Sequence, residues 1–115
     1  MGKWKKSSEQ LIALFHETLE QFKGHEMRKM FGYPCSFMNG NMFTGLHEEN
    51  WVLRLKEEDR IAASKLGALP FTPMGRTMKE YVILPQSILE DKSQLKWWVE
   101  RSLNFVKELP PKLKK

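Results

Sequence analysis

Apolar residues recur at three- and four-residue steps in two stretches, one near each end of the chain. The first stretch contains Leu11, Ile12, Phe15, Leu19 and Phe22, and the second contains Leu95, Trp98, Val99, Leu103 and Val106 together with Ser102. Such spacing puts side chains on one face of an α-helix. We predict a first helix capped by Ser7 or Ser8 that ends at Gly24. The last helix is predicted to start near Ser93 and to stop before Pro110-Pro111.

Between these two helices the apolar residues alternate with polar ones, which is the pattern of β-strands. Two of these runs are separated by Asn39-Gly40, a dipeptide typical of a type I′ hairpin turn because both residues tolerate positive φ. A second turn is predicted at residues 47–50. Before the first turn, residues 27–33 read as a strand, and Gly32 and Pro34 indicate a bulge or a break before residues 36–38.

Two further strands and a short helix follow the second turn. Residues 51–55 alternate, which predicts a core face with Trp51, Leu53 and Leu55 and a wetter face with Val52 and Arg54. The acidic run 57–59 favours a helix start, with an apolar stripe of Ile61, Ala62 and Leu66 and a stop at Gly67. Residues 81–84 are continuously apolar, which favours a strand well inside the sheet. The connection at residues 70–78 is the longest, and such loops often carry function.

Together these elements predict an α+β fold, in which an antiparallel sheet of four to five strands is packed by three helices. Their expected order is one helix, three or four strands, a helix, a strand and a final helix. The chain has 115 residues, which fits one domain. We assign residues 7–109 to this domain, between a basic N-terminal tail at 1–6 and a basic C-terminal tail at 110–115.

The net charge of +5 belongs to the two tails. Their lysines are Lys3, Lys5, Lys6, Lys112, Lys114 and Lys115. In residues 7–109 the other 13 Lys and Arg face 14 Asp and Glu, a net charge of −1. A nearly neutral body is a poor surface for phosphates unless its charges are segregated. Nucleic-acid binding is therefore an alternative that the composition does not favour.

The residue types that usually carry chemistry are scattered. Cys35 is the only cysteine, so no internal disulfide is possible and a reducing, cytoplasmic location is expected. The three histidines, His16, His25 and His47, lack the short spacings of metal ligands. No apolar run has the length of a signal peptide or a membrane span. We expect no metal, no cofactor and no enzymatic activity.

Arg76 is the clearest candidate for contact with a ligand. It follows Gly75 in the longest loop, Lys79 comes three residues later, and Arg28 belongs to a strand that could lie nearby. A planar cation beside flexible backbone can hold a carboxylate or a phosphate. The alternative, which we favour, is that Arg76 holds its loop to an acidic residue such as Glu80 or Glu26.

The methionines and two adjacent tryptophans point to a protein interface. Apart from Met1, the methionines are Met27, Met30, Met38, Met42, Met74 and Met78, all in the strand and loop regions. Flexible thioethers fill gaps in a core, which is the interpretation we favour for these methionines, and they also line adaptable binding surfaces. Trp97 and Trp98 point about 100° apart on a helix, so only one can enter the core. We predict interface roles for Trp97, Met74 and Met78.

The order of several short motifs resembles the TfoX/Sxy N-terminal domain family. They are Met30-Phe31-Gly32, residues 39–43, Pro70-Phe71, Gly75-Arg76 with Met78, Glu80-Tyr81, and Leu84-Pro85 with Leu89 and Asp91. The resemblance implies one antiparallel sheet packed by helices, an association with regulation of competence in the founding members, and no catalytic residues. Those members carry a second, C-terminal domain. Since this chain ends six residues after Leu109, we expect a form without it.

The sequence therefore predicts a small non-enzymatic binding domain that acts through a protein partner or a second copy of itself. A regulatory role is implied only by the resemblance. A nucleic-acid module, which would gather Lys and Arg on one face, is an alternative. The other is a domain that binds a small anionic ligand with the loop around Arg76.

Overall fold

The computed structural model describes residues 5–111, within which one antiparallel sheet of six strands and four α-helices are formed. The elements are α1 (Glu9–Leu19), β1 (Glu26–Met30), β2 (Tyr33–Met38), β3 (Asn41–His47), β4 (Asn50–Arg54), α2 (Glu57–Lys65), β5 (Leu69–Pro70), the 3₁₀ turn η1 (Pro73–Gly75), β6 (Tyr81–Ile83), α3 (Gln86–Leu89) and α4 (Lys92–Lys107). The sheet order is β1-β2-β3-β4-β6-β5. The α+β prediction is confirmed. Lys3, Lys112, Lys114 and Lys115 of the predicted tails lie outside the described residues.

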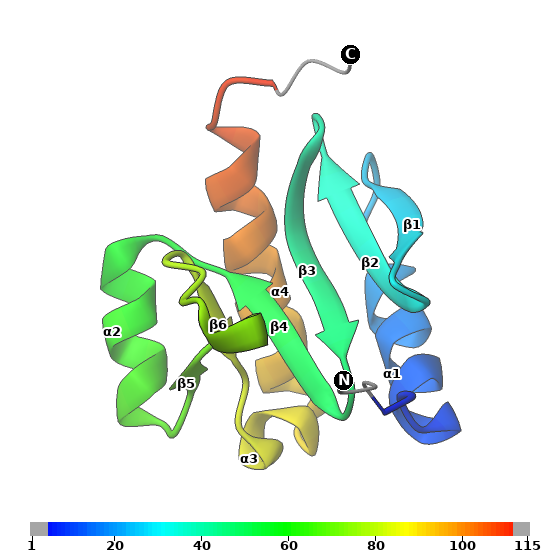
Figure 1. Cartoon of the computed structure of the whole chain (residues 1–115). Helices are drawn as coiled ribbons and strands as arrows, with labels where there is room; N and C mark the ends of the chain where they lie inside the picture. The colour runs from blue at the N-terminus through cyan, green and yellow to red at the C-terminus, as the bar shows by residue number, and fades with distance from the viewer. Residues whose placement is uncertain (1–4, 112–115) are drawn as a thin grey trace.

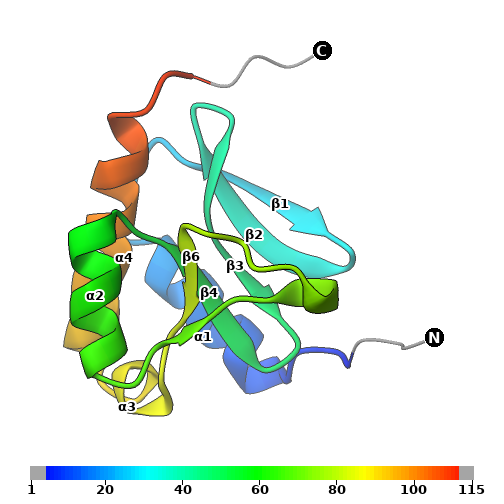
Figure 2. The same cartoon turned by 60° about the vertical axis from the view of Figure 1, so that its left-hand side comes forward.

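The helices lie on one face of the sheet, which we call the inner face (Figure 1). Long helix α4 crosses β3 and β4, α1 lies beside it under β2, and α2 flanks α4 at the far side. Figure 2 shows the connection between β5 and β6, which includes η1, on the opposite, outer face. The helices therefore cover most of one side of the sheet, and the connection covers part of the other.

The core forms where the two amphipathic helices meet the inner face. Phe15 of α1 packs against Trp51 of β4 with ring centroids 5.0 Å apart. Every residue predicted for the apolar face of the last helix is buried, including Ser102. Its N-cap is Asp91, whose side chain accepts hydrogen bonds from the backbone N–H groups of Ser93 and Gln94. These local signals explain why the last helix was predictable.

Two-residue turns join the first four strands. Asn39 and Gly40 have φ of +54° and +81°, which confirms the predicted type I′ turn. Phe31 and Gly32 have φ of +54° and +85°, so the break predicted at Gly32 is a third hairpin turn between β1 and β2. The segment 27–33 is therefore two strands rather than one. Pro34 lies in β2 just before the ladder with β3 begins, where its missing N–H breaks no ladder bond.

The end of the first helix and two short elements differ from the sequence predictions. The first helix ends at Leu19 rather than Gly24. The carbonyl of Leu19, at the end of the helix, accepts a hydrogen bond of 2.8 Å from His25 Nε2. The short strand β5 and the short helix α3 were not predicted, because two and four residues are too few for a periodic pattern.

The predicted apolar stripe of α2 is also wrong. Its three members, Ile61, Ala62 and Leu66, are exposed, whereas Asp59 and Ala63 are buried. The Asp59 carboxylate accepts a hydrogen bond of 2.9 Å from the guanidinium of Arg101 on α4. This ion pair joins the two helices on the side of α2 that faces the domain.

A buried hydroxyl joins α4 to the sheet, and its loss is expected to be costly. Ser102 Oγ lies 3.0 Å from the carbonyl oxygen of Phe43 and 2.5 Å from that of Arg54. Ser102→Ala is expected to lower the free energy of unfolding by about 1–3 kcal/mol, because buried carbonyls lose their donor. Ser93→Ala, on the exposed first turn of α4, should change it by less than about 0.5 kcal/mol. Urea titration followed by circular dichroism measures both. Equal effects would contradict the predicted role of Ser102.

Candidate binding groove

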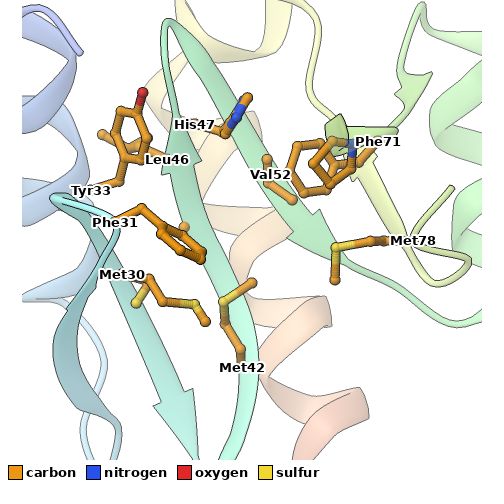
Figure 3. A pocket seen from close by; sticks show the side chains of 12 residues that line it. Met30, Phe31, Tyr33, Met42, Leu46, His47, Val52, Phe71 and Met78 are labelled. Carbon is orange, nitrogen blue, oxygen red and sulfur yellow. The ribbon is translucent and has the colours of Figure 1, made fainter. Parts of the chain in front are cut away.

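An apolar groove lies on the outer face, between the β1–β2 turn and the connection that follows β5 (Figure 3). Its cavity volume is about 220 Å³. The lining side chains come from four strands and this connection, and they are almost all apolar. They are Met30, Phe31, Tyr33, Cys35, Met42, Leu46, His47, Val52, Phe71, Pro73 and Met78, with Gly45 at the floor.

Gly45 makes room for the groove because it places no side chain on the outer face. It pairs with Cys35 of β2 on one side and with Val52 of β4 on the other. A Cβ added at Gly45 would lie 2.9 Å from Cys35 Cβ, closer than side chains normally approach. The sheet therefore depends on glycine here for close packing as well as for the depth of the groove.

An aromatic row closes one end of the groove. The ring of His47 packs against Tyr33 at 5.5 Å and against Phe71 at 5.4 Å, measured between ring centroids. Phe71 and its neighbours in the connection cover Val52, which is buried rather than on the wetter face that alternation predicted. The alternation of 51–55 is confirmed, but tertiary packing buries part of the second face.

Three methionines and one phenylalanine surround the opening. Figure 3 shows Met30, Phe31 and Met42 on one side and Met78 on the other. The Phe31 side chain is 80% exposed although its backbone has φ of +54°. A bulky residue in the left-handed region costs about 1–2 kcal/mol. The turn therefore holds an aromatic ring at the edge of the groove.

The groove offers few groups for chemistry. Burial raises the pKa of the Cys35 thiol, which opposes formation of the reactive thiolate. The Cys35 Sγ donates a long bond of 3.5 Å to the carbonyl of Arg28. The Tyr33 hydroxyl donates to the carbonyl of Lys5. Within residues 5–111, no group of three His, Cys, Asp or Glu side chains could hold a metal ion. The lining suits an apolar group rather than a polar or charged one.

The predicted ligand residues do not converge on the groove. Arg28 on β1 pairs with Glu26 at 3.1 Å and lies over the ring of Phe37 at 5.0 Å. Arg76 and Lys79 are exposed in the connection before β6, and none of the three lines the cavity. Glu80, which was suggested as a partner of Arg76, instead pairs with Arg54 at 2.7 Å. An anion-binding role for these cations stays a prediction.

The predicted interface residues lie on two different surfaces. Met78 lines the groove, and Met74 belongs to η1 in the same connection. Trp97 is 50% exposed on the solvent side of α4, while its neighbour Trp98 is 4% exposed and enters the core. Trp97 meets Trp98 edge to face, and the Arg101 guanidinium lies 4.7 Å from the centre of its ring. Self-association through Trp97 stays a prediction.

Sequence reasoning gave no binding role to most of the groove residues, among them Phe31 and Gly45. An isolated glycine inside an alternating strand does indicate close approach of another backbone, so Gly45 could have been found. Phe31 gives no such signal, because its positive φ follows from the hairpin register and not from its own propensity.

The fold defines a small α+β domain with one antiparallel sheet whose helices gather on a single face. The chain matches the model of the TfoX N-terminal domain family over residues 17–106, and it belongs to this family. A search of curated proteins found no match, and neither did a search of solved structures. Among the helices of residues 5–111, none is long and apolar enough to cross a membrane.

Proposed function

We propose that this TfoX N-terminal domain is a non-enzymatic binding domain that acts by contact with another protein. The contact site is the outer-face groove, which takes up one bulky apolar side chain from a segment of the partner. The observation that carries this proposal is the ring of Met30, Phe31, Met42 and Met78 around a cavity with an apolar lining. Thioethers adapt their shape to an inserted side chain, and aromatic anchors dominate the energy of many interfaces.

The charges near the groove favour an acidic partner segment. Lys5 and Lys6 line a hollow that Phe31 shares with the groove, and Arg76 lies in the connection on the other side. Lys79 belongs to the same connection and lines a separate hollow beside α2. Across residues 5–111, no ion pair neutralises the side chains of these four cations.

Most acidic groups near the groove are already engaged. The turn after His47 holds Glu48 and Glu49, and the Glu48 carboxylate accepts the backbone N–H of Lys5. Glu26 and Glu80 pair with arginines. Opposite charges across an interface speed encounter and select partners. We therefore assign the occupant of the groove as a partner segment with one bulky apolar side chain between acidic residues. In this proposal, the domain has a regulatory role through binding of that segment in the groove.

The test uses the methionine methyl groups, which report on the groove and on two control positions. A peptide with a central phenylalanine between glutamates is titrated into protein labelled at the methionine methyls. We expect the methyl resonances of Met30, Met42 and Met78 to shift. Those of Met27, on the inner side of β1, and of buried Met38 should not move.

Matched variants separate the groove from the rest of the surface. Met78→Gln should weaken peptide binding about tenfold or more, since it loses apolar contact worth about 1–2 kcal/mol. Leu66→Gln, on exposed α2, should leave binding unchanged. Equal binding of a peptide with lysines in place of the glutamates would contradict the acidic partner. If dodecanoate shifts the groove methyls and no peptide does, the proposed protein partner is wrong.

A further inference from the structure

The two edges of the sheet differ in a way that matters for association. At one edge, β5 has only two residues, and one of them is Pro70, which has no N–H to donate. At the other edge, β1 has five residues and no proline, and no described element runs along its outer side (Figure 2). Proteins usually blunt long edge strands because these invite pairing with another chain. Here one edge is blunted and the other is left available.

The hairpin register shows which backbone groups of β1 point outward. Met30 and Tyr33 flank a two-residue turn, so this pair exchanges hydrogen bonds within the hairpin. The bonded pairs alternate along an antiparallel ladder, which leaves the N–H and C=O groups of Met27 and Lys29 facing away from β2. Within residues 5–111 no hydrogen bond takes up these groups. They are donors and acceptors ready for another strand.

The side chains of β1 then decide what kind of strand fits. Glu26 and Arg28 lie two residues apart on the outer face and form an ion pair of 3.1 Å. If two copies of β1 pair antiparallel with Met27 opposite Met27 of the second copy, each Glu26 faces an Arg28. A register centred on Arg28 sets two arginines opposite each other, and one centred on Lys29 sets two lysines opposite. Like charges directly opposite are destabilising, so only the first register is self-complementary.

We propose that two copies of this chain associate through their β1 edges, antiparallel and centred on Met27, so that the two sheets become continuous. The symmetry is two-fold, because the same patch contributes from both copies. Met27, which is 37% exposed, then packs against its counterpart on the inner side of the joined sheet. Each Arg28 gains a second carboxylate while it keeps its own. The groove is not part of this contact, so this inference goes beyond the proposed function and stands or falls separately.

Charge exchange tests this pairing. The wild-type chain is expected to form dimers that dissociate on dilution, because one pair of strands buries less area than a stable interface. Glu26→Arg and Arg28→Glu each place like charges across the contact and should weaken association about tenfold or more. The double variant Glu26→Arg, Arg28→Glu keeps every pair with its sign reversed and should dimerise as the wild type does. Sedimentation equilibrium over a range of concentrations measures all four.

An equimolar mixture of the two single variants is the decisive sample. One variant carries two arginines at these positions and the other carries two glutamates, so the mixture should form heterodimers at concentrations at which each variant alone is largely monomeric. A merely destabilised strand would give no such rescue. Amide hydrogen exchange at Met27 and Lys29 should also slow as wild-type concentration rises. A wild-type chain that stays monomeric at the highest soluble concentration, or a mixture that stays monomeric, would overturn the proposal.

Discussion

Trp51→Ala is expected to lower the free energy of unfolding by about 3–5 kcal/mol, a large part of the 5–15 kcal/mol that holds a typical domain together. The Trp51 side chain is fully buried on β4 and lies at the meeting point of the sheet and α1. Its Nε1–H donates to Thr44 Oγ1 over 2.8 Å, and the Thr44 hydroxyl donates in turn to the Val52 carbonyl. Alanine would leave a cavity and remove this donor at once.

Two control variants separate these causes. Trp51→Phe keeps most of the apolar volume and removes only the N–H, so the expected loss is about 1–3 kcal/mol. Trp97→Ala removes a half-exposed ring that contacts Trp98 and Arg101, and we expect a loss near 1 kcal/mol. Urea unfolding followed by far-ultraviolet circular dichroism avoids the change in tryptophan fluorescence. A larger effect at Trp97 than at Trp51 would mean that the core is elsewhere.

The parts of the fold that could be predicted are those in which local and tertiary demands agree. Helix α4 has a continuous apolar face, a capping Asp91 and two prolines beyond its end, so each signal points to the same element. The turn at Asn39-Gly40 needs positive φ at both residues, and both tolerate it. The strand 51–55 was predictable for its inner face because three alternating residues all enter the core.

The orientation of helix α2 could not be predicted from local patterns. Its buried residues are Asp59, which pairs with Arg101 42 positions away, and Ala63. Ile61 and Leu66 stay exposed. A pattern within nine residues carries no information about a partner on another helix.

The groove was predictable only in part, because some of its features depend on contacts between strands. The concentration of methionines in strands and loops indicated an adaptable surface, and Met30, Met42 and Met78 do line it. Other methionines have different places, since Met38 is buried in the core. The floor depends on Gly45 facing Cys35 across two strands, which requires the register of β2 and β3. That register contains an irregularity at Ser36/Phe37, and such a shift cannot be read from the alternation of one strand alone.

Gly45→Ala is expected to destabilise the domain by about 1–3 kcal/mol, the usual cost of overpacking a core position. The new Cβ would lie 2.9 Å from Cys35 Cβ and 3.5 Å from the Pro34 carbonyl oxygen, so the strands have to separate. The same methyl group would reduce the depth of the groove. Urea unfolding measures the stability, and peptide titration with methionine methyl detection measures the groove.

A double-mutant cycle shows whether the contact with Cys35 causes this loss. Cys35→Gly removes the opposing Cβ, so Gly45→Ala should cost about 1–2 kcal/mol less in that background. Cys35→Ala is the matched control, because it removes the sulfur and keeps the Cβ, and it should give no such relief. If Cys35→Ala relieves the strain as well as Cys35→Gly does, the sulfur and not the strand spacing limits the site. If neither does, the close approach of β2 and β3 at the floor of the groove is wrong.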